Sequence, residues 1–163
     1  MTETIINAFN LPDAMTNLVK AGHTLVALVL VIILGAATAG PAQAESTDVF
    51  TVVTSGDSET QMMAMVLSNQ MLNRGVTVRV LLCSEGGRLG VEGELFPVFD
   101  PAERTPQQLL QRLIAEGATV EVCAIFLPNS GYDEGNLLEG IGVAAPGDVA
   151  DYMLGEGVRY FTF

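Results

Sequence analysis

The sequence predicts an α/β fold built on a mainly parallel sheet. Residues 48–54 (D-V-F-T-V-V-T) form a nearly continuous apolar run, which is typical of strands that are covered on both faces. A turn at residues 55–57 and a predicted helix at residues 58–73 follow, and residues 77–83 (T-V-R-V-L-L-C) form a second apolar run. A strand, a helix and a strand in this order indicate a βαβ unit, in which the two strands are parallel.

Two helices have recognisable starts. Ser58 and Gln61 fit the S-x-x-Q capping box, which predicts the beginning of the first helix. Thr105, Pro106 and Gln108 combine a capping hydroxyl, a proline at the first helical position and a glutamine at the third. We therefore expect a second helix that runs to about residue 116.

The remaining predicted elements are shorter. A third strand contains Cys123 and is stopped by the sequence P-N-S-G at residues 128–131. The glycine-rich stretch at residues 84–93 is expected to form a mobile loop, and two prolines make residues 94–104 a loop or a poor edge strand. Further along we expect a short helix at 133–138, an extended piece at 141–144, a helix at 146–154 and a last strand at 157–163.

The first 44 residues differ in character from the rest. An uncharged run at residues 24–40 follows Lys20, and P-A-Q-A at residues 41–44 has the small-x-small pattern of a signal-peptidase site. We interpret residues 1–44 as a cleaved signal peptide or, alternatively, as an uncleaved membrane anchor. Both interpretations export residues 45–163, which are expected to form one domain in the periplasm, in contact with a membrane only through an uncleaved anchor.

The exported part is strongly acidic. It has 17 Asp and Glu residues against 6 Arg residues, with no lysine and no histidine. Binding to nucleic acid is not expected, because phosphates require a positive surface. The sequence also lacks both nucleotide-binding glycine fingerprints, and we expect no metal and no cofactor.

Two cysteines are the candidate reactive groups. Cys83 and Cys123 each lie at or near the carboxyl end of a predicted strand, and these ends share one edge of a parallel sheet, where ligands bind. Helix N-termini at that edge lower a thiol pKa and favour the nucleophilic thiolate. Cys123 is therefore a candidate reactive or persulfide-carrying residue, and Cys83 is a secondary thiol. Two alternatives are a structural disulfide between them and a pair of inert buried thiols.

Three further residues could line the same cleft. Asp57 lies in the first strand-to-helix turn, Arg88 lies in the glycine-rich stretch as a possible anion contact, and Tyr132 follows the Cys123 strand. For the residues around Tyr132, capping of the short helix is the alternative.

The stretches V-E-V-C-A-I-F-L-P-N-S-G (120–131) and L-L-E-G-I-G-V-A-A-P-G-D-V-A-D-Y-M-L-G-E-G-V-R-Y-F-T-F (137–163), with T-V-V-T-S-G-D (51–57), resemble the DsrE/DsrF-like family of sulfur-relay proteins. The resemblance implies a three-layer α/β/α domain with a five-stranded sheet and assembly into homotrimers or hexamers. It also implies that Cys123 accepts sulfane sulfur as a persulfide, and it assigns no role to Cys83.

The sequence thus supports three hypotheses about function. In the first, Cys123 takes sulfane sulfur from a donor and passes it to the thiol of a partner protein, as a sulfur carrier or a sulfurtransferase. The second is a non-catalytic oligomeric binding or scaffold protein, in which the methionine-rich helix at 58–73 supplies an interface. The third is thiol–disulfide exchange that uses Cys83 and Cys123.

Overall fold

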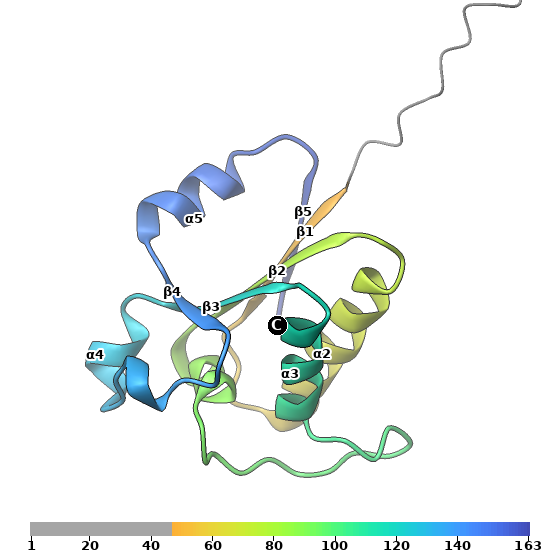
Figure 1. Cartoon of the computed structure of the whole chain (residues 1–163), viewed down its shortest axis with the longest axis vertical. Coiled ribbons are helices and arrows are strands. Elements are labelled where there is room, and N and C mark those ends of the chain that lie inside the picture. The colour runs from red at the N-terminus through yellow and green to blue at the C-terminus, as the bar shows by residue number, and fades with distance from the viewer. Residues whose placement is uncertain (1–46) are drawn as a thin grey trace, which may run out of the picture. The chain divides into compact units, whose positions relative to one another are not determined.

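The computed structural model describes residues 47–163, so the predictions for residues 1–44 lie outside the described residues. The described part contains a five-stranded sheet with the order β4-β3-β2-β1-β5, in which every pair of neighbouring strands is parallel (Figure 1). The expected α/β architecture is confirmed. The strands are β1 (Asp48–Val53), β2 (Thr77–Leu82), β3 (Thr119–Cys123), β4 (Ile141–Ala144) and β5 (Val158–Thr162).

One face of the sheet is covered by two helices, α2 (Ser58–Leu72) and α3 (Pro106–Ala115). Successive side chains of each strand point to opposite faces of the sheet. The apolar side chains on one face pack against buried residues of both helices. These side chains and the helix residues form the main core: Val49, Val53, Val78, Val80, Leu82, Val120 and Val122 from the strands, Ala64 and Met65 from α2, and Leu110 and Leu113 from α3.

The opposite face carries a smaller cluster. Phe50, Leu81 and Ala144 are buried there, and Val149 and Tyr152 of α5 (Pro146–Met153) pack against them. No residue of α5 is itself fully buried. Because α5 connects β4 at one edge to β5 at the other, it crosses this face of the sheet, and the three-layer arrangement is present (Figure 1).

The start of α3 agrees with the prediction, whereas that of α2 does not. The Thr105 hydroxyl accepts from the backbone N–H of Gln108, whose side chain accepts from the N–H of Thr105, so the predicted capping box is present. At α2 the cap is Asp57, one residue before the expected Ser58. The carboxylate of Asp57 accepts hydrogen bonds more readily than a hydroxyl, and Gln61 is instead buried and donates to the carbonyl of Ser55.

Two stretches next to the cysteines differ from the prediction. Residues 84–90 form a 3₁₀ helix, η2 (Ser84–Gly90), where a mobile loop was expected. After β3 the chain turns into a short helix, α4 (Phe126–Ser130), so Pro128 lies inside a first helical turn rather than in a strand-ending loop. The helix expected at 133–138 is a single 3₁₀ turn, η3 (Glu134–Asn136), capped by Asp133.

No helix within residues 47–163 has both the length and the apolar character needed to cross a membrane.

Candidate functional site

The two cysteines end neighbouring strands of the sheet. Leu82, the last residue of β2, pairs with Val122 of β3, so Cys83, which follows β2, lies beside Cys123, the last residue of β3. Both side chains are on the α5 face, where they contact the cluster around Leu81. Both are partly exposed free thiols. The expectation that the two thiols share one edge of the sheet is met.

The pKa of Cys83 is raised to about 12, contrary to the lowering expected beside a helix N-terminus. Burial is the main cause, because it disfavours the charged thiolate. The neighbouring Cys123 adds to the shift, through its own charge when ionised and through a hydrogen bond with Cys83. Cys83 therefore stays protonated at neutral pH, although it immediately precedes η2.

The backbone after Cys83 is fixed against the end of β1. The N–H of Cys83 donates to the carbonyl of Val53 at 2.8 Å, and the N–H of Gly86 donates to the carbonyl of Thr54 at 3.2 Å. A Cβ atom on Gly86 would lie 2.3 Å from the Val53 oxygen, so only glycine permits this approach. Ser84 adopts a positive φ of 51°, which turns the chain away from the strand.

Gly87 packs against α4. A Cβ atom at Gly87 would lie 2.4 Å from the Phe126 ring, so this position has no room for a side chain. The Phe126 ring in turn stacks on Tyr132, with 6.2 Å between the ring centroids. These contacts hold η2 and α4 together as two walls of a cavity.

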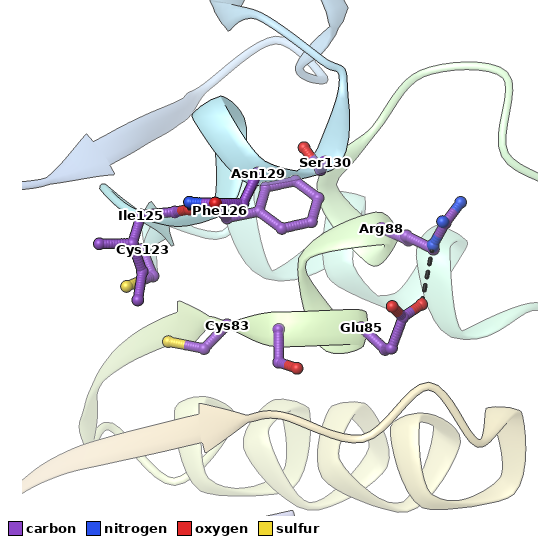
Figure 2. A pocket seen from close by; sticks show the side chains of 9 residues that line it. Cys83, Glu85, Arg88, Cys123, Ile125, Phe126, Asn129 and Ser130 are labelled. Carbon is purple, nitrogen blue, oxygen red and sulfur yellow. Dashed lines mark hydrogen bonds and ion pairs between the residues drawn. The ribbon is translucent and has the colours of Figure 1, made fainter.

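This cavity has a volume of about 470 Å³. Figure 2 shows the cysteines at one end and the Arg88–Glu85 ion pair at the other. The lining residues are Cys83, Ser84, Glu85, Arg88, Cys123, Ile125, Phe126, Asn129 and Ser130. Cys123 also contributes to a second, apolar recess of about 240 Å³ on the α5 side, together with residues such as Leu81, Val149 and Met153.

Arg88 lines the cavity, but its charge is already paired. Its Nε donates to Glu85 at 2.9 Å, and its Nη1 lies 3.3 Å from Glu94 Oε1. Tyr132 donates to Glu94, and this hydrogen bond is the main reason that the pKa of Tyr132 is raised. With two carboxylates around one guanidinium, this end of the cavity does not present an unpaired positive charge.

Asp57 and Tyr132, the other two residues that the sequence predicts in the cleft, do not line the cavity. The carboxylate of Asp57 accepts from the N–H and hydroxyl of Thr60, both at 2.8 Å, and thereby caps α2. These hydrogen bonds lower the pKa of Asp57. Tyr132 reaches the site only indirectly, through the hydrogen bond that its hydroxyl oxygen accepts from Arg88 and through its stacking on Phe126.

Sequence reasoning missed the contribution of α4 and of Glu94. Phe126, Asn129 and Ser130 line the cavity from a five-residue helix, which is too short to show a helical period. Pro128, which is tolerated in a first helical turn, was the one local signal for it. Glu94 reaches Arg88 and Tyr132 from an irregular loop, and no local pattern predicts such a contact. Within residues 47–163 no three His, Cys, Asp or Glu side chains form a group that could hold a metal ion.

Comparison with known proteins identifies the fold. No protein-family model matches the chain, and no curated protein sequence does. Solved structures do match: the ychN protein from E. coli superimposes with a TM-score of 0.58 and 20% identity, over 72% of this chain and 99% of that one. The domain has the YchN fold.

A second structure supports the same conclusion. MTH1491 from Methanobacterium thermoautotrophicum, a protein of unknown function, matches with a TM-score of 0.55 and 20% identity, over 73% of this chain and 100% of its own. Both matches extend over essentially the whole of the compared proteins. YchN is itself a DsrE/DsrF-like protein, so the fold that the resemblance implied is confirmed.

Proposed function

We propose that the domain is a sulfur carrier in which Cys123 holds sulfane sulfur as a persulfide. The observation that carries this proposal is the place of the Cys123 thiol. It is partly exposed at the carboxyl end of an internal parallel strand, and it lines a cavity of about 470 Å³. A YchN fold and the DsrE/DsrF-like sequence stretches support sulfur handling in particular.

The chemistry needs two thiol exchanges. In loading, the Cys123 thiolate attacks the outer sulfur of a donor persulfide, R–S–SH; a new S–S bond forms, the donor S–S bond breaks, and R–S⁻ leaves and is protonated. In unloading, the thiolate of a partner protein attacks the outer sulfur of the Cys123 persulfide, and Cys123 leaves as a thiolate. No oxidant or reductant is consumed in either step.

The surroundings of the two thiols favour Cys123 as the attacking one. The thiolate is the nucleophilic form, and the raised pKa of Cys83 keeps that residue protonated at neutral pH. Cys123 also has space on two sides, since it lines both the larger cavity and the apolar recess beside α5. Either space accommodates one additional sulfur atom without moving the strand.

Export to the periplasm and assembly into a homo-oligomer are parts of this proposal that rest on the sequence. The predicted signal at residues 1–44 supports export, and the DsrE/DsrF-like resemblance supports a trimer or hexamer. A periplasmic carrier would meet its donor and acceptor proteins outside the reducing cytoplasm.

Intact-protein mass spectrometry tests the proposal. Cys83→Ser, incubated with polysulfide without oxygen and then desalted, should gain about 32 Da, with the added sulfur mapped to the Cys123 peptide. Cys123→Ser is the matched control, because it keeps one thiol in the same cavity but should gain nothing. If Cys83→Ser does not load, or if Cys123→Ser loads equally well, the proposal is wrong.

The two other hypotheses give different results in the same experiment. A scaffold protein in which the thiols merely pack would show no mass change in any variant. A thiol–disulfide exchange protein would lose about 2 Da when the wild type meets a disulfide such as oxidised glutathione, and it would load no sulfur in Cys83→Ser.

A further inference from the structure

We propose that Cys83 is a resolving thiol, which discharges the Cys123 persulfide as sulfide and leaves a Cys83–Cys123 disulfide. This inference rests on the proposed function, since it needs a persulfide on Cys123. It gives a role to a cysteine that the carrier mechanism does not use, and it adds sulfide release to sulfur transfer.

The backbone geometry permits the bond. Cys83 and Cys123 follow the paired residues Leu82 and Val122, so they are neighbours across two parallel strands. Neighbouring strands lie about 4.8 Å apart, and the Cα atoms of disulfide-bonded cysteines lie about 4.4–6.8 Å apart. No change of strand register is therefore required.

The side chains also have a suitable direction. Figure 2 shows both sulfur atoms on the same side of their strands. Both cysteines contact one apolar cluster, and both line the same cavity. The backbone on the Cys83 side is held by the hydrogen bond from its own N–H to Val53. The attacking sulfur is thus kept close to its target.

The step balances within the protein. The Cys83 thiolate attacks Sγ of Cys123, a bond between the two Sγ atoms forms, the persulfide S–S bond breaks, and the outer sulfur leaves as HS⁻. The outer sulfur gains two electrons and becomes sulfide, and the two cysteine sulfurs lose them in becoming a disulfide. The proton lost by Cys83 goes to water. A dithiol reductant, such as a thioredoxin-like protein, would return the domain to its reduced form.

Burial makes this discharge slow compared with transfer to a partner. Cys83 is largely protonated at neutral pH, and the charged side chains that line its cavity, Glu85 and Arg88, are paired with each other. An external thiolate with an ordinary pKa would react faster. Sulfide release would therefore predominate when no acceptor protein is present.

The test compares wild type with Cys83→Ser after loading. Both proteins are loaded with polysulfide without oxygen, desalted, and incubated with no acceptor while intact mass and free sulfide are followed. Wild type should lose its added sulfur at least about tenfold faster than Cys83→Ser, because the variant lacks the attacking thiol. It should release one sulfide per persulfide and end about 2 Da below the reduced mass.

The outcomes separate the two proposals. If Cys83→Ser never loads, the carrier function fails and the present inference fails with it. If both proteins load but wild type keeps its sulfur as long as the variant, or if the sulfur is found on Cys83 with no sulfide released, only the resolving role is overturned. Cys83→Ala, with circular dichroism as a check of folding, excludes an effect of the introduced hydroxyl.

Discussion

Arg79 and Glu121 form an ion pair between β2 and β3, with 2.7 Å between Nη2 and Oε2, on the same sheet face as the two cysteines. Their side chains are only 13% and 19% exposed. The Arg79 guanidinium also lies over the Tyr152 ring of α5, 4.8 Å from its centroid. The pair therefore joins two strands and the helix that covers them.

Breaking this ion pair should destabilise the domain. Glu121→Gln leaves the Arg79 charge largely out of water without its partner, and we expect the free energy of unfolding to fall by about 2 kcal/mol, less than for a fully buried pair. Urea unfolding measures the change. Glu116→Gln is the matched control: its pair with Arg112 has the same 2.7 Å distance but is 51% and 37% exposed, and should contribute about 0.5 kcal/mol or less. Equal effects would contradict this account.

Gly87→Ala should destabilise the domain and disturb the cavity. The added methyl group would lie 2.4 Å from the Phe126 ring, and we expect a loss of about 1–3 kcal/mol in urea unfolding. Gly147→Ala in α5 provides the comparison, since a Cβ there meets nothing within 4 Å and should be neutral or stabilising by up to about 1 kcal/mol. A neutral Gly87→Ala would mean that Phe126 moves freely.

The cap of α2 should make stability depend on pH at acidic values. Hydrogen bonds from Thr60 lower the folded-state pKa of Asp57 below its ordinary value of 3.8. A lowered pKa adds stability that is fully present above that ordinary value and is lost as the pH falls through the folded-state pKa. Asp57→Asn keeps a capping oxygen but has no charge to lose. The difference in melting temperature between wild type and this variant should therefore shrink as the pH falls. A constant difference between the two proteins would argue against the ionised cap.

The two thiols should differ in their reaction with iodoacetamide. Near neutral pH the Cys123 peptide should be labelled first, because the raised pKa keeps Cys83 protonated. Labelling of Cys83, measured in Cys123→Ser to remove the competing thiol, should accelerate about tenfold per pH unit below its pKa. The substitution also removes the second cause of the shift, so the apparent pKa should lie below the value in wild type and above that of an ordinary thiol. An ordinary value would show that burial has little effect.

The homo-oligomer stays a prediction, and the structure offers a surface for it. Met153, Leu154 and Tyr160 of the α5–β5 segment are exposed large apolar residues, and Leu154 is 83% exposed. If this surface is the interface, Leu154→Glu should shift the protein to smaller species in analytical ultracentrifugation. Leu95→Glu, at a loop position that is 94% exposed, should leave the assembly unchanged. The same assembly in all three proteins would place the interface elsewhere.

The strands β1 and β2 could be predicted from the sequence because their apolar runs are nearly continuous. The sequence also indicates that Cys83 and Cys123 lie near each other, since the carboxyl ends of parallel strands meet at one edge of the sheet. The start of α2 was misplaced because Ser58 and Gln61 fit a capping box while a better acceptor, Asp57, lies one residue earlier. In a capping box Gln61 would turn back to the helix start, but burial favours its bond to Ser55.

The cavity walls could not be predicted either, and the reason differs from that for α2. They depend on contacts between η2 and α4, such as Gly87 against Phe126, which join residues far apart in the sequence. In the sequence, Gly86 and Gly87 indicate a mobile loop, although each glycine is needed because backbone or ring atoms approach it closely. A glycine pair carries the same local signal in both cases, and only the tertiary contact distinguishes them.

The adjacency of Cys83 and Cys123 has a consequence for the durability of the domain. A covalent link between them would close a loop from residue 83 to residue 123 that includes α3, and loops of this length lower the entropy of the unfolded chain by the equivalent of about 4 kcal/mol. The disulfide form, which has released its sulfur, would then resist heat and proteases better than the reduced form, which can accept sulfur. Melting temperature alone would report which of the two forms a sample contains.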